Sequence, residues 1–105
     1  MAANYSESMT FPASGAQIFQ ACTQAVPQCG FTITEANPQA GQIQAKSGMG
    51  MLSWGEIITI GVADGRADIR SSCRGMQVID YGKNKRNVKS LLSALGSMLA
   101  PTPQP

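Results

Sequence analysis

"WGEIITIGVADGRADIRSSCR", residues 54–74, is the stretch of sequence that decides the fold. Asp64-Gly65 is a favoured two-residue hairpin turn, and it separates two runs in which side chains alternate in character. After the turn, the small and apolar residues from Ala67 to Cys73 fall on one face of an extended chain, and charged or polar residues fall on the other. The stretch therefore predicts an antiparallel hairpin with one face in the core and one in solvent.

Residues 31–47 predict a second hairpin. The period changes from helical to alternating at the start of this stretch, and "NPQAG", residues 37–41, supplies the proline and glycine of a turn. The inward positions on the returning strand are Ile43, Ala45 and Ser47. A further strand is indicated near the N-terminus, where alternate residues from Tyr5 to Phe11 share one parity.

Two amphipathic helices are predicted, one before the hairpins in the sequence and one after them. Ser14 and Gln17 form a capping box, because each side chain can satisfy a backbone N–H left free at a helix start. Pro27 and Gly30 indicate where this first helix ends. The last helix has an apolar stripe at helical spacing and ends before Pro101. The stripe consists of Val88, Leu91, Leu92, Leu95, Met98 and Leu99.

The predicted order of elements is strand, helix, four strands, helix. An apolar helix stripe has to be buried, and an antiparallel sheet with one apolar face offers the matching surface. We therefore expect a two-layer α+β fold, β-α-β-β-β-β-α, in which a sheet of about five strands packs against two helices. Residues 1–100 form the single domain, and "PTPQP", residues 101–105, is expected to be a disordered proline-rich tail.

"GFTI", "SWGEI" and "DYGKN" before a leucine-rich final helix resemble small uncharacterised bacterial single-domain proteins. The order of elements is also similar to the helix-grip and TATA-binding-protein-like folds, in which a curved antiparallel sheet packs on helices. The resemblance covers most of residues 5–99 and is one of topology and spacing. It implies a fold and no activity. DNA binding is not implied, since the chain has one such unit and three scattered phenylalanines.

Composition and charge narrow the classes of function. The chain of 105 residues is 43% hydrophobic and 13% charged, with a net charge of +2. Four positive charges lie within residues 83–89, so the remainder is net negative and sequence-specific nucleic acid is not an expected partner. No stretch is long and apolar enough to be a transmembrane segment. The N-terminus and an odd cysteine count indicate a cytoplasmic protein with reduced thiols.

The positive cluster is the first candidate site. Gly82, Lys83, Lys85, Arg86 and Lys89 lie where the last helix begins, which is the end of a helix that repels cations. Backbone N–H groups, a glycine and nearby cations together suit phosphate or another anion. Asn84 or Asn87 is expected to cap the helix. The alternative is that these side chains only keep the surface soluble.

The second candidate site is "SGMGMLSWG", residues 47–55. Glycines make the segment adaptable, and methionine adapts to irregular partners. Its large apolar residues are therefore predicted to contact an apolar ligand or a partner protein. They are Met49, Met51, Leu52 and Trp54. The alternative is that Trp54 anchors the core and the methionines fold over it.

Several chemistries find no support in the sequence. The chain has no histidine, which removes the commonest general base and a common metal ligand. Its three cysteines lack metal-site spacing and are expected to be buried small hydrophobes. Three arginines share one face of a strand, where they either form a solvent-exposed surface or contact acidic groups of a partner. They are Arg66, Arg70 and Arg74. No catalytic residue, metal or cofactor is predicted.

The most direct interpretation is a non-catalytic binding module. It holds an apolar or amphiphilic small molecule, or a segment of a protein partner, between the sheet and the C-terminal helix. The alternative is binding of phosphate or a lipid headgroup at the basic helix start. The two combine if the tail of an amphiphile enters the pocket while its head meets the cations. An enzyme is the third class, and nothing in the sequence favours it. The ligand, the biological process and the oligomeric state stay open.

Overall fold

The computed structural model describes residues 4–47, 55–73 and 82–99. Seven elements follow one another along the chain. They are β1 (Asn4–Thr10), α1 (Gly15–Gln28), β2 (Thr32–Asn37), β3 (Gln42–Lys46), β4 (Glu56–Ala63), β5 (Arg66–Cys73) and α2 (Lys83–Leu99). This is the β-α-β-β-β-β-α order that the sequence predicted, and the α+β fold class is confirmed.

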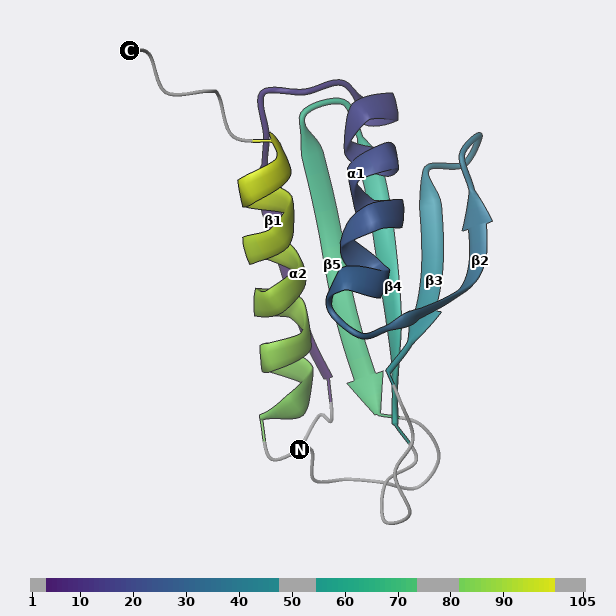
Figure 1. The fold of residues 1–105 in the computed structure, drawn as a ribbon, viewed down its shortest axis with the longest axis vertical. Coiled ribbons are helices and arrows are strands. Elements are labelled where there is room, and N and C mark those ends of the chain that lie inside the picture. Colours follow the sequence, from purple (N-terminus) through teal and green to yellow (C-terminus); the bar gives the residue numbers. More distant parts are fainter. Residues whose placement is uncertain (1–3, 48–54, 74–81, 100–105) are drawn as a thin grey trace.

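The five strands form one antiparallel sheet in the order β1-β5-β4-β3-β2 (Figure 1). The predicted Asp64-Gly65 turn joins β4 to β5, with Ala63 opposite Arg66 and Ile60 opposite Ile69. The first strand does not pair with its neighbour in sequence but with β5, so that Glu7 lies opposite Ile69. Both hairpins predicted from alternation therefore exist, and the N-terminal strand completes the sheet beside the later one.

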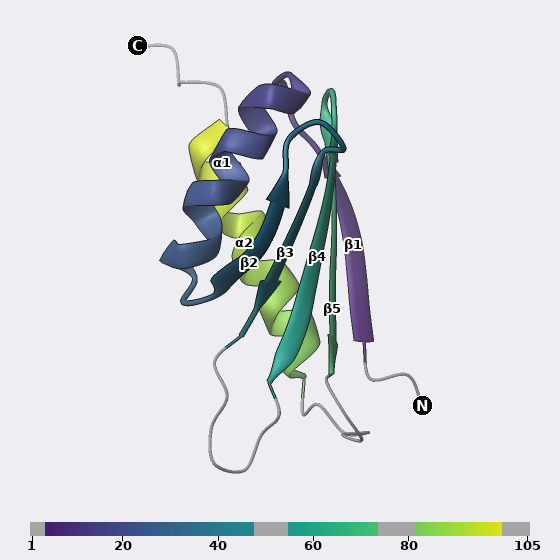
Figure 2. The ribbon, with the colours of Figure 1, turned by 90° about the vertical axis from the view of Figure 1, so that its right-hand side faces the viewer.

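Both helices cover the same face of the sheet (Figure 2). The alternation of each strand follows this arrangement: Ile58, Ile60, Ala67 and Ile69 are buried under the helices, whereas Ile57 is 36% exposed on the other face. The core also contains Ile18, Cys22 and Val26 of α1 and Val88, Leu91 and Leu95 of α2. The domain therefore has two layers and one covered sheet face, as a single apolar stripe on each helix requires.

The helix ends follow local chemistry, with one correction. The Ser14 side chain accepts from the Gln17 N–H and the Gln17 side chain accepts from the Ser14 N–H, which is the predicted capping box. The expectation that Asn84 or Asn87 caps the last helix is wrong. Gly82 has a φ of 81°, and its carbonyl accepts from the Arg86 N–H at 3.0 Å, so the helix already begins at Lys83. Both asparagines are inside α2 and buried.

Candidate functional site

Four element ends meet at one end of the domain, which we call the α2-start end. Here β3 ends at Lys46, β4 begins at Glu56, β5 ends at Cys73 and α2 begins at Lys83 (Figure 1). The predicted basic site belongs to this end. The basic residues are part of it, whereas Met49, Met51, Leu52 and Trp54 lie outside the described residues. The segment that carries them joins Ser47 to Gly55, and both of those residues are buried here.

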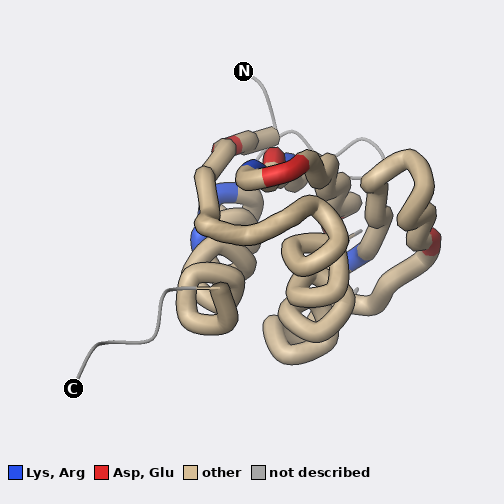
Figure 3. Tube along the Cα trace, turned by 90° about the horizontal axis from the view of Figure 1, so that it is seen from above, with Lys and Arg blue, Asp and Glu red and all other residues tan. Residues whose placement is uncertain are grey.

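The structure gathers the predicted basic residues on the first two turns of α2, directly after Gly82. Lys85, Arg86 and Lys89 are exposed, and Lys83 is half-buried. The helix is described in full, and its first turn has no acidic residue. Figure 3 shows how uneven the charge is: α1 carries no charged residue, and the lysines and arginines lie along α2 and on the strands.

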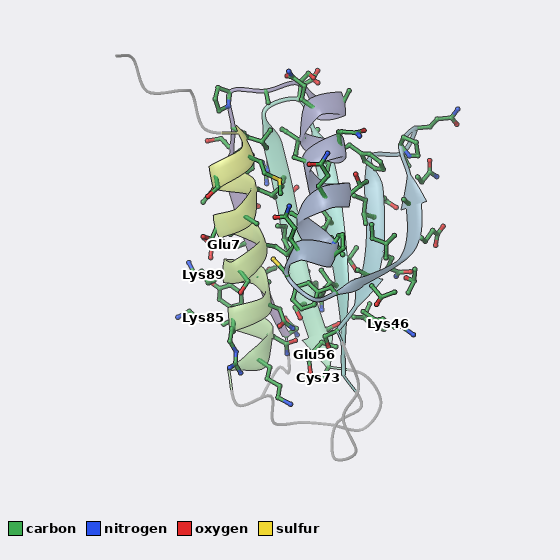
Figure 4. The ribbon with its side chains drawn as sticks, viewed as in Figure 1. Glu7, Lys46, Glu56, Cys73, Lys85 and Lys89 are labelled. Carbon is green, nitrogen blue, oxygen red and sulfur yellow. The ribbon has the colours of Figure 1, made fainter. Side chains whose placement is uncertain are left out.

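One side of the helix turns its cations toward β1. The Lys89 Nζ lies 2.7 Å from the Glu7 Oε1, and the Tyr5 hydroxyl donates to the same oxygen at 2.7 Å (Figure 4). The hydrogen bond from Lys89, then that from Tyr5, hold the pKa of Glu7 below its ordinary value, and Lys85 adds a weaker attraction. The same contact raises the pKa of Lys89. Lys89 is therefore in an ion pair, which the sequence analysis did not anticipate.

A second side of the helix carries the other two cations. Residues three and four apart are neighbours on a helix surface, so Lys83 lies one turn before both Arg86 and Asn87. Asn87 is buried and donates to Glu56 on β4, whereas Arg86 is exposed. In the basic cluster, Lys89 is paired with Glu7 and Lys85 lies near the same carboxylate, whereas Lys83 and Arg86 are neighbours on another side of the helix.

Beneath the helix start lies a buried group of polar side chains, which we call the polar cluster. Its members come from β4, β5, α2 and the end of β3: Ser47, Glu56, Ser71, Cys73, Asn84 and Asn87. Glu56 is only 3% exposed. Its Oε1 accepts from the Ser47 hydroxyl at 2.8 Å and from the Asn87 amide at 3.0 Å. Its backbone N–H donates to the Ser47 Oγ at 2.7 Å.

The cluster continues across β5. The Asn87 amide donates to the Ser71 Oγ at 3.1 Å, and the Ser71 hydroxyl donates to the Asn84 Oδ1 at 2.8 Å. The Asn84 amide donates to the Cys73 Sγ at 3.4 Å. Among the described residues, Glu56 Oε2 is a buried side-chain atom with no hydrogen-bond partner. Figure 4 places Glu56 and Cys73 at the α2-start end.

The sequence contains a signal for this cluster, which the sequence analysis interpreted as a helix cap. Asn84 and Asn87 are one turn before Val88 and Leu91, so they continue the buried stripe of α2 with polar residues. An amide in an apolar stripe must find partners when it is buried. Ser47 and Ser71 likewise occupy inward positions on their strands. Local spacing identifies these residues singly, but not their meeting across the two layers.

The helix-free face of the sheet is polar, and it carries an ion pair. A shallow hollow of about 710 Å³ lies there, lined mainly by serine, threonine and charged side chains of β1, β4 and β5. Arg66 Nε lies 2.9 Å from Asp68 Oδ1, and the Ser8 hydroxyl donates to the same carboxylate. Arg66 and Arg70 share this exposed face as predicted, and Arg74 lies outside the described residues. The face suits solvent better than a charged partner.

Comparison with known proteins supports the fold. No protein-family model matches the sequence, and no curated protein matches it significantly. A DUF4468 family protein from Bacteroides ovatus is similar in structure, with a TM-score of 0.59 and 15% identity over 97% of this chain and 89% of that one. Ara h 8.0201, a helix-grip protein, has a TM-score of 0.52 and 11% identity over 93% and 98%.

A TBP-like protein from Parabacteroides distasonis is also similar, with a TM-score of 0.49 and 22% identity over 66% of this chain and 53% of that one. The chain is a small two-layer α+β domain, and its fold is similar to those of the DUF4468 family protein and of Ara h 8.0201. At these identities, the likeness shows the fold alone. None of the described helices is long and apolar enough to cross a membrane.

Proposed function

We propose that the protein is a non-catalytic binding module that holds an anion, either phosphate or the anionic headgroup of a lipid, at the start of α2. One observation carries the proposal: α2 begins with Lys83, Lys85 and Arg86 and has no acidic residue in its first turn. The start of a helix is itself partly positive, so these cations are unfavourable there until an anion binds. An anion would reverse that repulsion and accept hydrogen bonds from the side chains.

The arrangement of the cations indicates which of them contacts the anion directly. Lys89 is already paired with Glu7, and Lys85 lies near the same carboxylate. Arg86 is exposed, shares its helix side with Lys83, and its guanidinium can hold two oxygens of a phosphate at once. We therefore assign the principal contact to Arg86, which lies one turn after Lys83 on the helix. Lys85 and Lys89 add a supporting positive potential.

A second candidate function is the one that the sequence favoured first, an apolar ligand or partner segment near Met49, Met51, Leu52 and Trp54. The supporting observation is that Ser47 and Gly55, which flank their segment in the sequence, are both buried at the α2-start end. Deeper in the same interface, Val88, Leu91 and Leu95 are fully buried against the sheet. An amphiphile would therefore place its head at the helix start and its tail at this end of the layer, not within the core.

The experiment that tests the proposal is an amide NMR titration of the labelled protein with inorganic phosphate, with anionic lysophospholipid micelles and with a fatty acid. Phosphate is expected to shift the amides of Gly82 to Asn87. R86E is expected to weaken phosphate binding by about tenfold or more, because a charge-assisted contact is lost and replaced by repulsion.

K85E is the matched control, since it makes the same charge change at the neighbouring exposed position on the Glu7 side of the helix. It is expected to weaken phosphate binding by no more than about threefold, as a screened surface charge would. Equal weakening by R86E, K85E and R70E, which lies on the helix-free face of the sheet, would mean diffuse attraction and no site. Shifts at Ser47 and Gly55 with the fatty acid alone would favour the second candidate.

A further inference from the structure

The two edges of the sheet differ in how well they are protected against pairing with another strand. β2 has a shift in register between Ile33 and Glu35 and is followed by Pro38, and both features blunt an edge. β1 pairs with β5 along its whole length without such a shift, and it contains no proline or glycine. Within the part of the chain that the structure describes, no strand lies on the outer side of β1. β1 is therefore the edge that is open to a further strand.

The hydrogen bonds at the end of β1 show which of its backbone groups point outward. The Phe11 N–H donates to the Gly65 carbonyl at 2.9 Å, on the side of β5. Alternate residues of an antiparallel strand direct their backbone groups to opposite sides. The residues with the parity of Phe11 therefore bond to β5, and those of the other parity point away from the sheet. The outward residues are Asn4, Ser6, Ser8 and Thr10, all of them exposed.

The side chains on the helix side of β1 suit a second copy of the same strand. Met9 has the same parity as Glu7, which contacts α2, and yet Met9 is 37% exposed. If two copies of β1 pair antiparallel with full overlap, Glu7 lies opposite Glu7 of the second copy and Tyr5 lies opposite Met9 of the second copy. A methionine sulfur beside an aromatic ring is a favourable contact. Pairing of β1 with itself thus covers an exposed apolar side chain.

The charges near the middle of β1 also fit a second copy. Glu7 alone would repel its counterpart, since like charges directly opposite each other destabilise a strand pair. Lys89 already lies 2.7 Å from Glu7, and Lys85 is one turn earlier on the same side of α2 (Figure 4). Lys85 makes no ion pair with any described residue, so it can approach Glu7 of the second copy. Each copy brings two lysines and one carboxylate, and the repulsion between the carboxylates is offset.

The side of α2 that lies beside this edge leaves space for a second copy. α2 packs against β1 and β5. Gly96 lies about two turns after Lys89 and therefore on the same side of the helix. A Cβ at Gly96 would meet no atom within 4 Å, so packing inside the domain does not require a glycine there. Glycine within a helix is unfavourable relative to alanine, and its usual benefit is the close approach of another group.

We propose that two copies of this chain pair antiparallel through their β1 strands, about a two-fold axis at Glu7, and form one continuous sheet. Ser6 and Ser8 of each copy exchange backbone hydrogen bonds with Ser8 and Ser6 of the other. The interface uses the same residues on both copies, as a closed two-fold dimer requires. The two outer edges of the joined sheet are then β2 strands, which are blunted, so that assembly stops at the dimer.

The test is sedimentation equilibrium of the full chain from about 1 μM to 1 mM, in which a dimer is expected. S6P removes an outward N–H and places a ring at the edge. It keeps the hydrogen bonds to β5, because proline is tolerated on an edge strand where the N–H faces solvent. S6P should weaken dimerisation by at least about tenfold, because backbone hydrogen bonds between the copies are lost. S6A retains the N–H, is the matched control and should change dimerisation by less than about twofold.

Two further variants test the charge match. K85E and R86E make the same charge change at neighbouring exposed positions of α2, but only Lys85 lies near Glu7. K85E should weaken dimerisation by about threefold or more at low ionic strength, and R86E should leave it unchanged. The dimer does not depend on the proposed anion site, whose principal contact is Arg86. Loss of phosphate binding in R86E with an intact dimer would separate the two.

A contact between copies can be measured on the unmodified protein. In a mixture of labelled and unlabelled protein, an intermolecular nuclear Overhauser effect is expected between the Tyr5 ring and the Met9 methyl group. Within one copy these residues lie about 13 Å apart along an extended strand, which is too far for this effect.

A protein that stays monomeric up to about 1 mM would overturn the proposal. A dimer that S6P does not weaken would overturn it as well, because the interface would then be another surface. A dimer without the contact between Tyr5 and Met9 of different copies would have the same meaning, even if S6P failed to fold.

Discussion

The side-chain amide of Asn87 on α2 donates to Glu56 on β4 at 3.0 Å. It also donates to Ser71 on β5 at 3.1 Å, so a single side chain ties the last helix to two neighbouring strands. From the next residue onward the buried positions of α2 are apolar, beginning with Val88 and continuing one turn later with Leu91. The contact between Asn87 and Glu56 therefore marks the boundary between a polar end and an apolar centre within one layer.

Replacing Asn87 with alanine is expected to lower the free energy of unfolding by about 1–3 kcal/mol, because Glu56 and Ser71 each lose a buried partner. Urea unfolding followed by circular dichroism measures the change. S90A, at an exposed position of the same helix, is the control and should stay within about 0.5 kcal/mol of the unmodified protein. Equal stability of N87A and S90A would contradict the assigned hydrogen bonds.

The Glu7–Lys89 pair is expected to make stability depend on pH and salt. The pKa of Glu7 is lowered in the folded state. The pair's contribution to the free energy of unfolding is therefore present above the ordinary glutamate pKa and is lost as the pH falls through the lowered value. The raised pKa of Lys89 sets the alkaline limit, where the contribution is lost as the pH rises through that value. E7Q should therefore be less stable than the unmodified protein near neutral pH and equally stable in strong acid.

The measurement for this pair is urea unfolding of both proteins near pH 7, at about pH 2 and near pH 7 with about 1 M salt. Because both side chains are partly exposed, salt should reduce the difference in stability between E7Q and the unmodified protein. A difference that is the same under all three conditions would mean that E7Q acts through packing and not through charge.

Gly41 is expected to tolerate alanine much less well than Gly30. Both have a positive φ, 66° and 86°, so alanine is strained at either position, at a cost of about 1–2 kcal/mol. A Cβ at Gly41 would also collide with the backbone carbonyl of Val62, whereas nothing lies near a Cβ at Gly30. Thermal unfolding of G41A and G30A separates the two effects. An equal loss of stability would show that the hairpin turn moves away from the added Cβ at no cost in free energy.

Cys22 is expected to react with iodoacetamide only when the whole domain unfolds. Burial raises the pKa of its thiol to about 12, so almost no reactive thiolate exists at neutral pH, and the side chain is fully buried. Cys29 and Cys73 are half-buried, and all three are free thiols. Mass spectrometry should show Cys22 labelled last, and sooner in N87A. Labelling of Cys22 as fast as Cys29 would mean that α1 opens by itself.

Much of the fold could be predicted because its determinants are local. The alternation on either side of Asp64-Gly65 gave both strands of the central hairpin, and the capping box at Ser14 placed the start of α1 correctly. The stripe from Val88 to Leu95 identified the buried side of α2. Each of these patterns lies within a few residues, where periodicity and turn chemistry carry the information.

The candidate site was harder to predict because its contacts join distant parts of the chain. Asn84 was assigned to a helix cap, since a cap is the local role of asparagine, but its partner Ser71 lies across the interface on β5. Lys89 was counted with its neighbours in sequence, whereas it pairs with Glu7 on the first strand. Helical spacing shows which residues face inward and does not show what they meet.

The strand order has a consequence for how the protein is made. Residues 4–10 leave the ribosome first, but the backbone that they pair with is that of residues 66–72, with Asn4 opposite Ser72. The N-terminal strand has no place in a sheet until β5 has been synthesised. Contacts between such distant residues make folding slow relative to helical domains of this size. The nascent chain must therefore carry residues 4–10 as an unpaired strand until residues 66–72 have also been synthesised.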